Sequence, residues 1–238
     1  LLAPVFCNDL GFAKGLWYSL FHSISAFCNA GFDILGTTEQ TFPSLTGYIA
    51  NPLINLVIML LIVIGGIGFL TWDDFCTNKW NLKRYRLQSK IILVTTAVLI
   101  LLPAIFFFLS DFAGFSMGKR ILASFFQSVT LRTAGFNTAD LGAMNDSSKA
   151  IMTLMMLIGG SPGSTAGGMK TTTIAVLILN AFATFGREAE TEVFGRRFDN
   201  TVVKNAATIA ILYFFLFFTG GIAVSYTHLR AHETSLHL

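Results

Sequence analysis

Two short stretches of this sequence end in the same glycine turn. Ser19 to Asp33 reads SLFHSISAFCNAGFD, and Ser124 to Asn137 reads SFFQSVTLRTAGFN. Glycine accepts backbone dihedrals that residues with a Cβ avoid, which lets successive carbonyl oxygens point the same way. A ring of such oxygens replaces the water around a dehydrated cation without a formal charge. The pattern therefore indicates cation coordination by backbone oxygens.

The two stretches align as an internal repeat. Phe21 to Ser25 matches Phe126 to Thr130, and Ala30 to Phe32 matches Ala134 to Phe136, with one residue skipped between the blocks. Such a repeat predicts one supersecondary unit used more than once. Each turn follows a short helix, whose partially negative C-terminal end is aimed at the same centre. Ordinary turns that close helical hairpins are the alternative, which two copies in the same relation to flanking apolar runs disfavour.

The composition is that of a membrane protein. Hydrophobic residues make up 53% of the chain and charged residues 12%, and there are 24 phenylalanines. Since a helical span uses about 20 residues, the 238 residues fit four or five spans plus re-entrant pieces. The three cysteines have no CxxC spacing, which supports neither a disulfide framework nor a zinc site. We expect an all-α polytopic membrane protein.

Apolar runs and positive charges predict the topology. Full spans are expected at 49–72, 91–110 (kinked at Pro103) and 205–224, and an interrupted one at 148–185. The basic loops at 73–90 and 186–204 are expected to be cytoplasmic, so the short helices 15–27 and 120–131 both enter from outside. Gly65, Gly66 and Gly68 permit close helix contact or form a flexible end.

A glycine-rich segment interrupts the third apolar run. Between Gly159 and Gly168 there are five glycines and a proline in ten residues, so the helix must break within the membrane. Lys170 is either a functional cation or a lysine that snorkels to the cytoplasmic face. A phosphate-binding loop is excluded, because Met169 separates Gly168 from Lys170 and no strand precedes the segment.

Three motifs carry a family resemblance. HSISAFCNAGFD, FQSVTLRTAGFN and GGSPGSTAGGMKTTT resemble the second filter, the third filter and the broken-helix loop of the Trk/Ktr/HKT potassium transporter superfamily, nearest its bacterial KtrB branch. The resemblance covers about residues 15 to 224 and implies a four-repeat pore fold of helix, pore-helix and helix units. About two and a half repeats are present, so the first repeat and the last filter are missing.

The resemblance also implies how the chain divides. It gives an external lead-in (1–14), the pore loop and second helix of repeat two (15–72), a cytoplasmic loop (73–90), repeat three with a broken second helix (91–185), a second cytoplasmic loop (186–204), the first helix of repeat four (205–224) and a non-native tail (225–238). The tail holds three of the four histidines without any periodicity. We interpret it as read-through or out-of-frame sequence.

Site residues follow from the resemblance position by position. It implies that the turns offer backbone oxygens to potassium and that a phenylalanine packs behind each turn. The filter residues are Asn29, Ala30, Gly31 and Phe32 with Thr133, Ala134, Gly135 and Phe136. The gating loop, a flexible obstacle beneath the filter, comprises Gly159, Gly160, Ser161, Pro162, Gly163, Ser164, Thr165, Ala166, Gly167, Gly168 and Lys170.

Two polar residues, Arg132 and His22, lie close in sequence to the glycine turns. Arg132 directly precedes the second turn, where a cation would repel permeant ions, so we expect a carboxylate or pore-loop carbonyls to neutralise it. His22 aligns with Gln127, which favours hydrogen bonding over metal ligation or proton transfer. No catalytic constellation occurs, so we do not expect an enzyme.

The expected function is potassium uptake across the cell membrane, in bacteria the inner membrane, with potassium as substrate and no cofactor in this chain. The resemblance implies a homodimer in membrane lipid, with a cytoplasmic nucleotide-binding ring of the KtrA type on the basic loops and no nucleic acid. The alternatives are transport of another monovalent cation, namely sodium, or an accessory membrane subunit of a sodium-translocating ATPase. A membrane enzyme is disfavoured, since the spans hold almost no ionisable residues. One glycine per filter leaves selectivity against sodium open.

Overall fold

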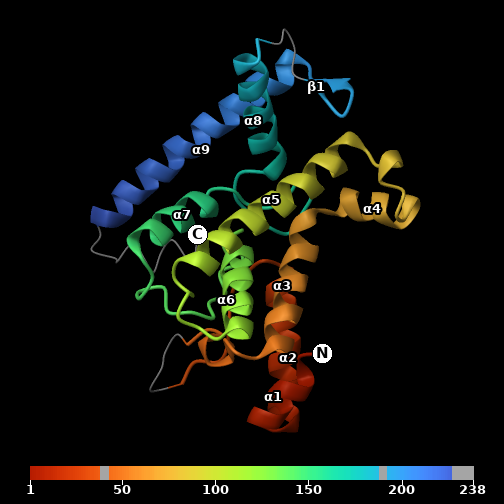
Figure 1. Ribbon diagram of the computed structural model, residues 1–238. Coiled ribbons are helices and arrows are strands. Elements are labelled where there is room, and N and C mark those ends of the chain that lie inside the picture. Colours follow the sequence, from red (N-terminus) through yellow and green to blue (C-terminus); the bar gives the residue numbers. More distant parts are fainter. Residues whose placement is uncertain (38–42, 188–191, 227–238) are drawn as a thin grey trace. The chain divides into compact units, whose positions relative to one another are not determined.

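The computed structural model describes residues 1–37, 43–187 and 192–226, and these residues are largely helical (Figure 1). The chain forms two compact units, 1–168 and 169–238. Each unit is described by itself below. The expected tail, 225–238, lies outside the described residues apart from its first two residues, and so do Glu188 and Glu190 of the second basic loop.

The first unit contains seven α-helices and two short 3₁₀ turns in its described part. Asn51 begins α3 by accepting the N–H groups of Leu53 (3.1 Å) and Ile54 (3.2 Å) on its side chain. Pro52 follows at the first helical position, where a missing N–H costs no hydrogen bond. The elements are α1 (Ala3–Leu10), α2 (Phe12–Phe27), η1 (Thr46–Tyr48), α3 (Pro52–Ile67), α4 (Phe69–Asn78), η2 (Leu82–Arg84), α5 (Leu87–Leu109), α6 (Met117–Thr130) and α7 (Asp146–Met156).

The second unit holds two helices and a hairpin that the sequence pattern did not predict. Helix α8 (Thr171–Phe185) precedes strands β1 (Glu192–Val193) and β2 (Arg196–Arg197), and α9 (Asn200–Tyr226) follows. The strands pair antiparallel, with Glu192 opposite Arg197, and these two side chains form an ion pair at 2.7 Å. Among the described residues, β1 and β2 are the only strands.

The expected spans are recovered only in part. Among described residues, α5 and α9 are long and apolar enough to cross a membrane, and α3 with α4 adds a third candidate if the pair is one broken span. The expected continuous span 49–72 is wrong in detail, because the chain turns by 96° between α3 and α4, where Gly68 adopts φ 94°. The interrupted run 148–185 becomes α7 and α8, and α8, at about 22 Å, is shorter than the hydrocarbon core. Pro103 lies inside the single helix α5.

The core of the first unit is built around the two short helices that precede the glycine turns. Helix α3 packs against both α2 and α6, and α5 packs along α6. The buried side chains between them include Ile54, Ile58 and Phe126, all fully enclosed. Within a bilayer, contacts of this kind stabilise the helices through close van der Waals packing, because lipid tails are as apolar as these side chains. The packing thus fixes the C-terminal ends of α2 and α6 within one body.

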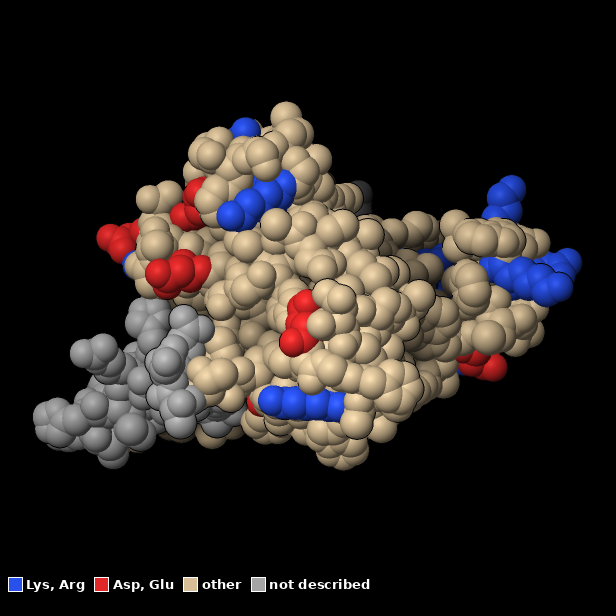
Figure 2. Space-filling model, turned by 90° about the horizontal axis from the view of Figure 1, so that it is seen from below, with Lys and Arg blue, Asp and Glu red and all other residues tan. Residues whose placement is uncertain are grey.

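Charged side chains are few and locally paired. Figure 2 shows a face on which uncharged residues predominate, with charged ones in small separate groups. In the first basic loop, the buried carboxylate of Asp74 accepts the hydroxyl of Ser89 (2.6 Å) and the N–H of Arg86 (3.0 Å). The Arg86 guanidinium also bonds Asp73 at 2.9 Å. These contacts join α4 to the start of α5.

Asp111 joins the end of α5 to the start of α7. Its carboxylate accepts hydrogen bonds from the N–H of Asn145 (2.8 Å) and from the hydroxyls of Ser110 (2.7 Å) and Ser148. Burial raises the pKa of this carboxyl, but the hydrogen bonds together outweigh burial, and the net pKa lies below its usual value. The link between the two helices therefore depends on the charged form.

We expect Asp111→Asn to lower the melting temperature by a few degrees at pH 7. The pKa of Asp111 is lower in the folded than in the unfolded state, so its charge stabilises the fold at any pH above the unfolded-state pKa, which is near 4. This stabilisation is lost as the pH falls through the folded-state pKa. The difference between variant and parent should thus shrink below roughly pH 4, which thermal unfolding across pH measures. Asp140→Asn, which removes an exposed carboxylate bonded to the N–H of Gly142, is the control. A difference that does not change with pH contradicts the assignment.

Candidate cation filter and its loop

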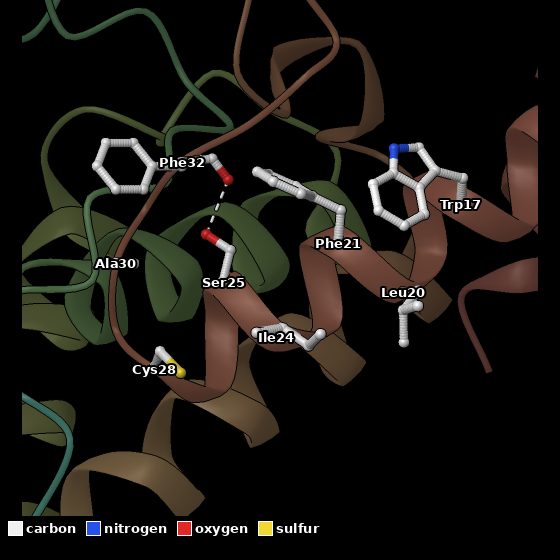
Figure 3. Close-up of a pocket in the computed structure, with 8 residues that line it drawn as sticks. All are labelled: Trp17, Leu20, Phe21, Ile24, Ser25, Cys28, Ala30 and Phe32. Atoms are coloured by element: carbon white, nitrogen blue, oxygen red, sulfur yellow. Dashed lines mark hydrogen bonds between the residues drawn. The ribbon is translucent and has the colours of Figure 1, made fainter.

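The first glycine turn closes α2. Asn29 and Gly31 are both left-handed, with φ of 51° and 70°, conformations that asparagine and glycine tolerate better than other residues. The N–H of Ala30 donates to the carbonyl of Ser25 at 2.9 Å, and the Ser25 hydroxyl donates to the carbonyl of Phe32 at 2.8 Å (Figure 3). One serine therefore holds both ends of the turn.

The second turn repeats this geometry residue by residue. Thr133 and Gly135, the counterparts of Asn29 and Gly31, have φ of 62° and 82°. The N–H of Ala134 donates to the carbonyl of Thr130 at 3.0 Å, and the Thr130 hydroxyl donates to the carbonyl of Phe136 at 2.6 Å. Thr133 is β-branched, so its left-handed backbone is strained. Both copies therefore form the same pair of hydrogen bonds. The residue skipped in the alignment lies between Ser25 and Ala30, within the segment that the first of these bonds closes.

The roles of Ser25 and Thr130 were not predicted, although the alignment contained the signal. Both residues occupy the last aligned position of the first block, and both carry a hydroxyl. A hydroxyl at the end of a short helix can satisfy a carbonyl of the turn beyond it. The hydroxyl shared by both copies, rather than either residue alone, indicates this hydrogen bond to the turn.

The two turns meet. A Cβ placed on Gly31 would lie 2.3 Å from the carbonyl oxygen of Ala134 and 2.8 Å from the Cα of Gly135. Distances this short leave no room for a side chain. Residues separated by about a hundred positions, which the alignment predicts to be equivalent, are thus in direct backbone contact.

The glycine-rich segment 159–168 packs on the C-terminal end of α3. The N–H groups of Ser161 and Thr165 donate to the carbonyls of Gly66 (2.9 Å) and Gly65 (3.2 Å), respectively. In the opposite direction, the N–H of Phe69 donates to the carbonyl of Gly163 (3.0 Å). A Cβ on Gly68 would lie 2.6 Å from the carbonyl oxygen of Pro162. The glycines of α3, which permit close helix contact, therefore receive this loop.

The same loop also contacts both turns. The side-chain amide of Asn29 donates to the hydroxyl of Thr165 at 3.1 Å. A Cβ on Gly168 would lie 3.2 Å from the Cγ2 methyl of Thr133. The loop thus lies against equivalent left-handed residues of both turns.

The two phenylalanines that follow the turn glycines differ, and the expected packing behind the turn is found for Phe136 but not for Phe32 within the described residues. Phe136 is fully buried, and its ring lies 6.3 Å from that of His22, centroid to centroid, whereas Phe32 is 60% exposed. His22 donates from Nδ1 to the carbonyl of Tyr18 at 2.7 Å, as its predicted hydrogen-bonding role requires. Its partner by alignment, Gln127, donates to the sulfur of Met152 at 3.0 Å. In the described residues no group of His, Cys, Asp and Glu could hold a metal ion.

Among the described residues, Arg132 does not have the partner expected for it. Only 5% of the residue is exposed, and its Nε and Nη2 atoms make no hydrogen bond within the described residues. A buried guanidinium without a partner is unfavourable by several kcal/mol. Lys170 is the N-cap residue that directly precedes α8 in the second unit.

An apolar groove of about 210 Å³ runs along α2 and the first turn (Figure 3). Trp17, Leu20 and Ile24 line it from the helix and are each more than half exposed. Cys28, Ala30 and Phe32 line it from the turn. The face of α2 opposite the core is therefore uncovered and apolar within the described residues.

The family model described as TrkH, cation transport protein, matches residues 4–236. The chain belongs to this family. Membership of the TrkH family, with the apolar helices described above, makes the chain an integral protein of the cell membrane. The resemblance inferred from the three motifs is confirmed.

Relatives of the TrkH family match most of the chain. The potassium/sodium uptake protein NtpJ of Enterococcus hirae is 38% identical over 213 residues, covering 87% of this chain and 46% of that protein. The Ktr system potassium uptake protein B of Bacillus subtilis is 34% identical over 223 residues, covering 91% and 48%. The chain thus spans about half the length of these relatives.

A solved structure shows the same fold. The crystal structure of the potassium transporter TrkH from Vibrio parahaemolyticus superposes with a TM-score of 0.76 at 20% identity, covering 96% of this chain and 49% of that one. The all-α membrane fold expected from the sequence is confirmed by this likeness.

Proposed function

We propose that this chain forms part of a pore for potassium uptake, in which the two glycine turns supply the backbone oxygens of the filter. The observation that carries the proposal is the contact between the turns, where Gly31 lies against Ala134 and Gly135 with the same left-handed pattern in both copies. Oxygens from residues 29–31 and 133–135 would replace water around the ion. One relative is named a potassium uptake protein, which supports the choice of potassium. The other is named a potassium/sodium uptake protein, which keeps sodium as the alternative ion.

The segment 159–168 is proposed as the gate. Non-helical backbone within a membrane is tolerated where it is buried in protein or lines a water-filled path. Its contacts with Asn29 and Thr133 place a non-helical segment beside both turns. The loop is joined to the end of α3 mainly by backbone hydrogen bonds and is itself not helical. It can therefore move away from the turns without breaking a helix.

The remaining pore is proposed to come from further units of the same kind. The buried Nε and Nη2 atoms of Arg132, which have no hydrogen-bond partner within the described residues, call for a polar neighbour beyond them. The uncovered apolar face of α2 offers such a unit a surface on which to pack. A carboxylate or a set of carbonyls on such a unit would neutralise Arg132. A homodimer, and a nucleotide-binding ring of the KtrA type on the basic loops, complete the proposed assembly in the lipid bilayer.

Ion uptake into liposomes containing the intact purified protein tests this function. We expect potassium uptake down its gradient, and at least about a tenfold loss in Gly135→Asp, since a carboxylate side chain at φ 82° disrupts the turn. Sodium uptake as fast as that of potassium would favour transport of another monovalent cation. Uptake retained in Gly135→Asp would instead favour an accessory subunit of a sodium-translocating ATPase.

A further inference from the structure

Asn29 carries a side chain that the filter itself does not use. It is 8% exposed, and its Nδ2 atom lies 3.1 Å from the Thr165 hydroxyl oxygen and 3.4 Å from the carbonyl oxygens of Phe27 and Ile62. The contact with Thr165 has the best length of the three. The amide group therefore points from the first turn towards the loop.

Thr165 is the matching residue on the loop. Its hydroxyl accepts from Asn29 and donates to the carbonyl of Phe27 at 2.7 Å, while its N–H donates to Gly65 at 3.2 Å. The neighbouring hydroxyl of Ser164 is buried and has no partner within the described residues. Thr165 thus joins the loop to the ends of both α2 and α3.

The close fit depends on a missing side chain at Gly65. A Cβ there would lie 1.9 Å from the carbonyl oxygen of Phe27 and 2.8 Å from the Thr165 hydroxyl. Most other loop contacts with α3 are single backbone hydrogen bonds. A glycine-rich segment gains much conformational entropy when it leaves its neighbours. The hydrogen bonds of the Thr165 side chain oppose this gain and help to keep the loop bound.

The second turn provides no equivalent. Thr133, the counterpart of Asn29, only packs against the loop through its methyl group near Gly168. Its hydroxyl has no hydrogen-bond partner in the part of the chain that the structure describes. The loop is therefore hydrogen-bonded to one turn and merely in contact with the other.

We propose that Asn29 and Thr165 form a latch that holds the gating loop closed beneath the first turn. The inference rests on the proposed function, and it assigns both residues as positioning residues of the gate. Since Asn29 is also a residue of the turn, any movement of the turn on ion binding alters the latch directly. The loop is thus coupled to the filter by one side chain.

The test compares Thr165→Val with Thr165→Ser. Valine keeps the shape but removes both hydrogen bonds of the hydroxyl, so the maximal rate of potassium uptake should rise about fivefold to tenfold with an unchanged KM. Serine should restore the parental rate. Thr153→Val is the matched control, because the hydroxyl of Thr153 bonds only the Lys149 carbonyl of its own helix within the described residues.

Hydrogen exchange of the same proteins gives a readout independent of transport. The N–H groups of Ser161 and Thr165 should exchange faster in Thr165→Val, while α5 and α6 stay as protected as in the parent. Unchanged exchange together with a parental or lower uptake rate would overturn the latch. Faster exchange in a protein whose parent takes up no potassium would support the loop contact and reject the proposed function.

Discussion

Gly31→Ala is expected to abolish potassium uptake, with a loss of at least about a hundredfold. The added Cβ would lie 2.3 Å from the carbonyl oxygen of Ala134, so one of the two turns must move. Alanine is also strained at the φ of 70° that Gly31 adopts. A misplacement of about 1 Å suffices to disrupt a site built for one geometry. Uptake of potassium or rubidium by the reconstituted intact protein measures the loss.

Gly118→Ala is the matched control for this substitution. Gly118 lies in the first turn of α6, and a Cβ on it meets no atom within 4 Å. Alanine is also the better helix former. We expect parental uptake and equal or higher thermal stability. Parental uptake in Gly31→Ala would instead mean that the contact between the turns plays no part in transport.

Removal of residues 163–167 is expected to raise the maximal rate of uptake by about tenfold or more. The deletion takes away Thr165, which is hydrogen-bonded to Asn29 of the first turn, and the hydrogen bond that the N–H of Phe69 donates to the carbonyl of Gly163. An obstacle removed from a conducting path increases flux without changing the ion's binding at the filter. The apparent KM for potassium should therefore stay the same, which concentration-dependent uptake measures.

The fold of the deletion variant must be verified in the same preparation. Phe107 of α5 and Ala123 of α6 lie in a buried cluster that includes Met152 of α7 and no residue of the segment 159–168, so the protection of α5 and α6 from hydrogen exchange should match the parent. Unchanged or lower flux in a variant that meets this criterion rules out the loop as a gate.

The sequence predicted the turns well because their chemistry is local. The glycines at Gly31 and Gly135 and the hydroxyls at Ser25 and Thr130 act within a few residues of their own helices. Such short-range interactions leave a repeated pattern that alignment of the two copies detects. The break in the third apolar run was equally visible, since glycine and proline exclude a continuous helix.

Contacts between distant segments left weaker signals. The glycines Gly65, Gly66 and Gly68 indicated close packing but not its partner, which is the loop nearly a hundred residues further along the chain. The turn of 96° at Gly68 was missed because the apolar run continues through it. Hydropathy indicates that a segment is buried or in contact with lipid. The direction of the chain after α3 depends instead on the left-handed Gly68 and on the loop 159–168 that packs against it.

The polar residues show the same limit. His22 was assigned to hydrogen bonding from its alignment with Gln127, and its bond to Tyr18 agrees. The partner of Arg132 could not be named from the sequence, and the described residues supply none for its Nε and Nη2 atoms. A side chain whose partner lies on another segment carries no local pattern that identifies that partner.

Residues 29–31 and 133–135 are proposed to coordinate a cation through their backbone oxygens. A structure of the intact protein in thallium or rubidium, ions with strong scattering that substitute for potassium, tests it most directly. We predict density within coordination distance of the carbonyl oxygens of both turns, and its loss in Gly31→Ala. Density elsewhere along the conducting path, with none between the two turns, would contradict the account.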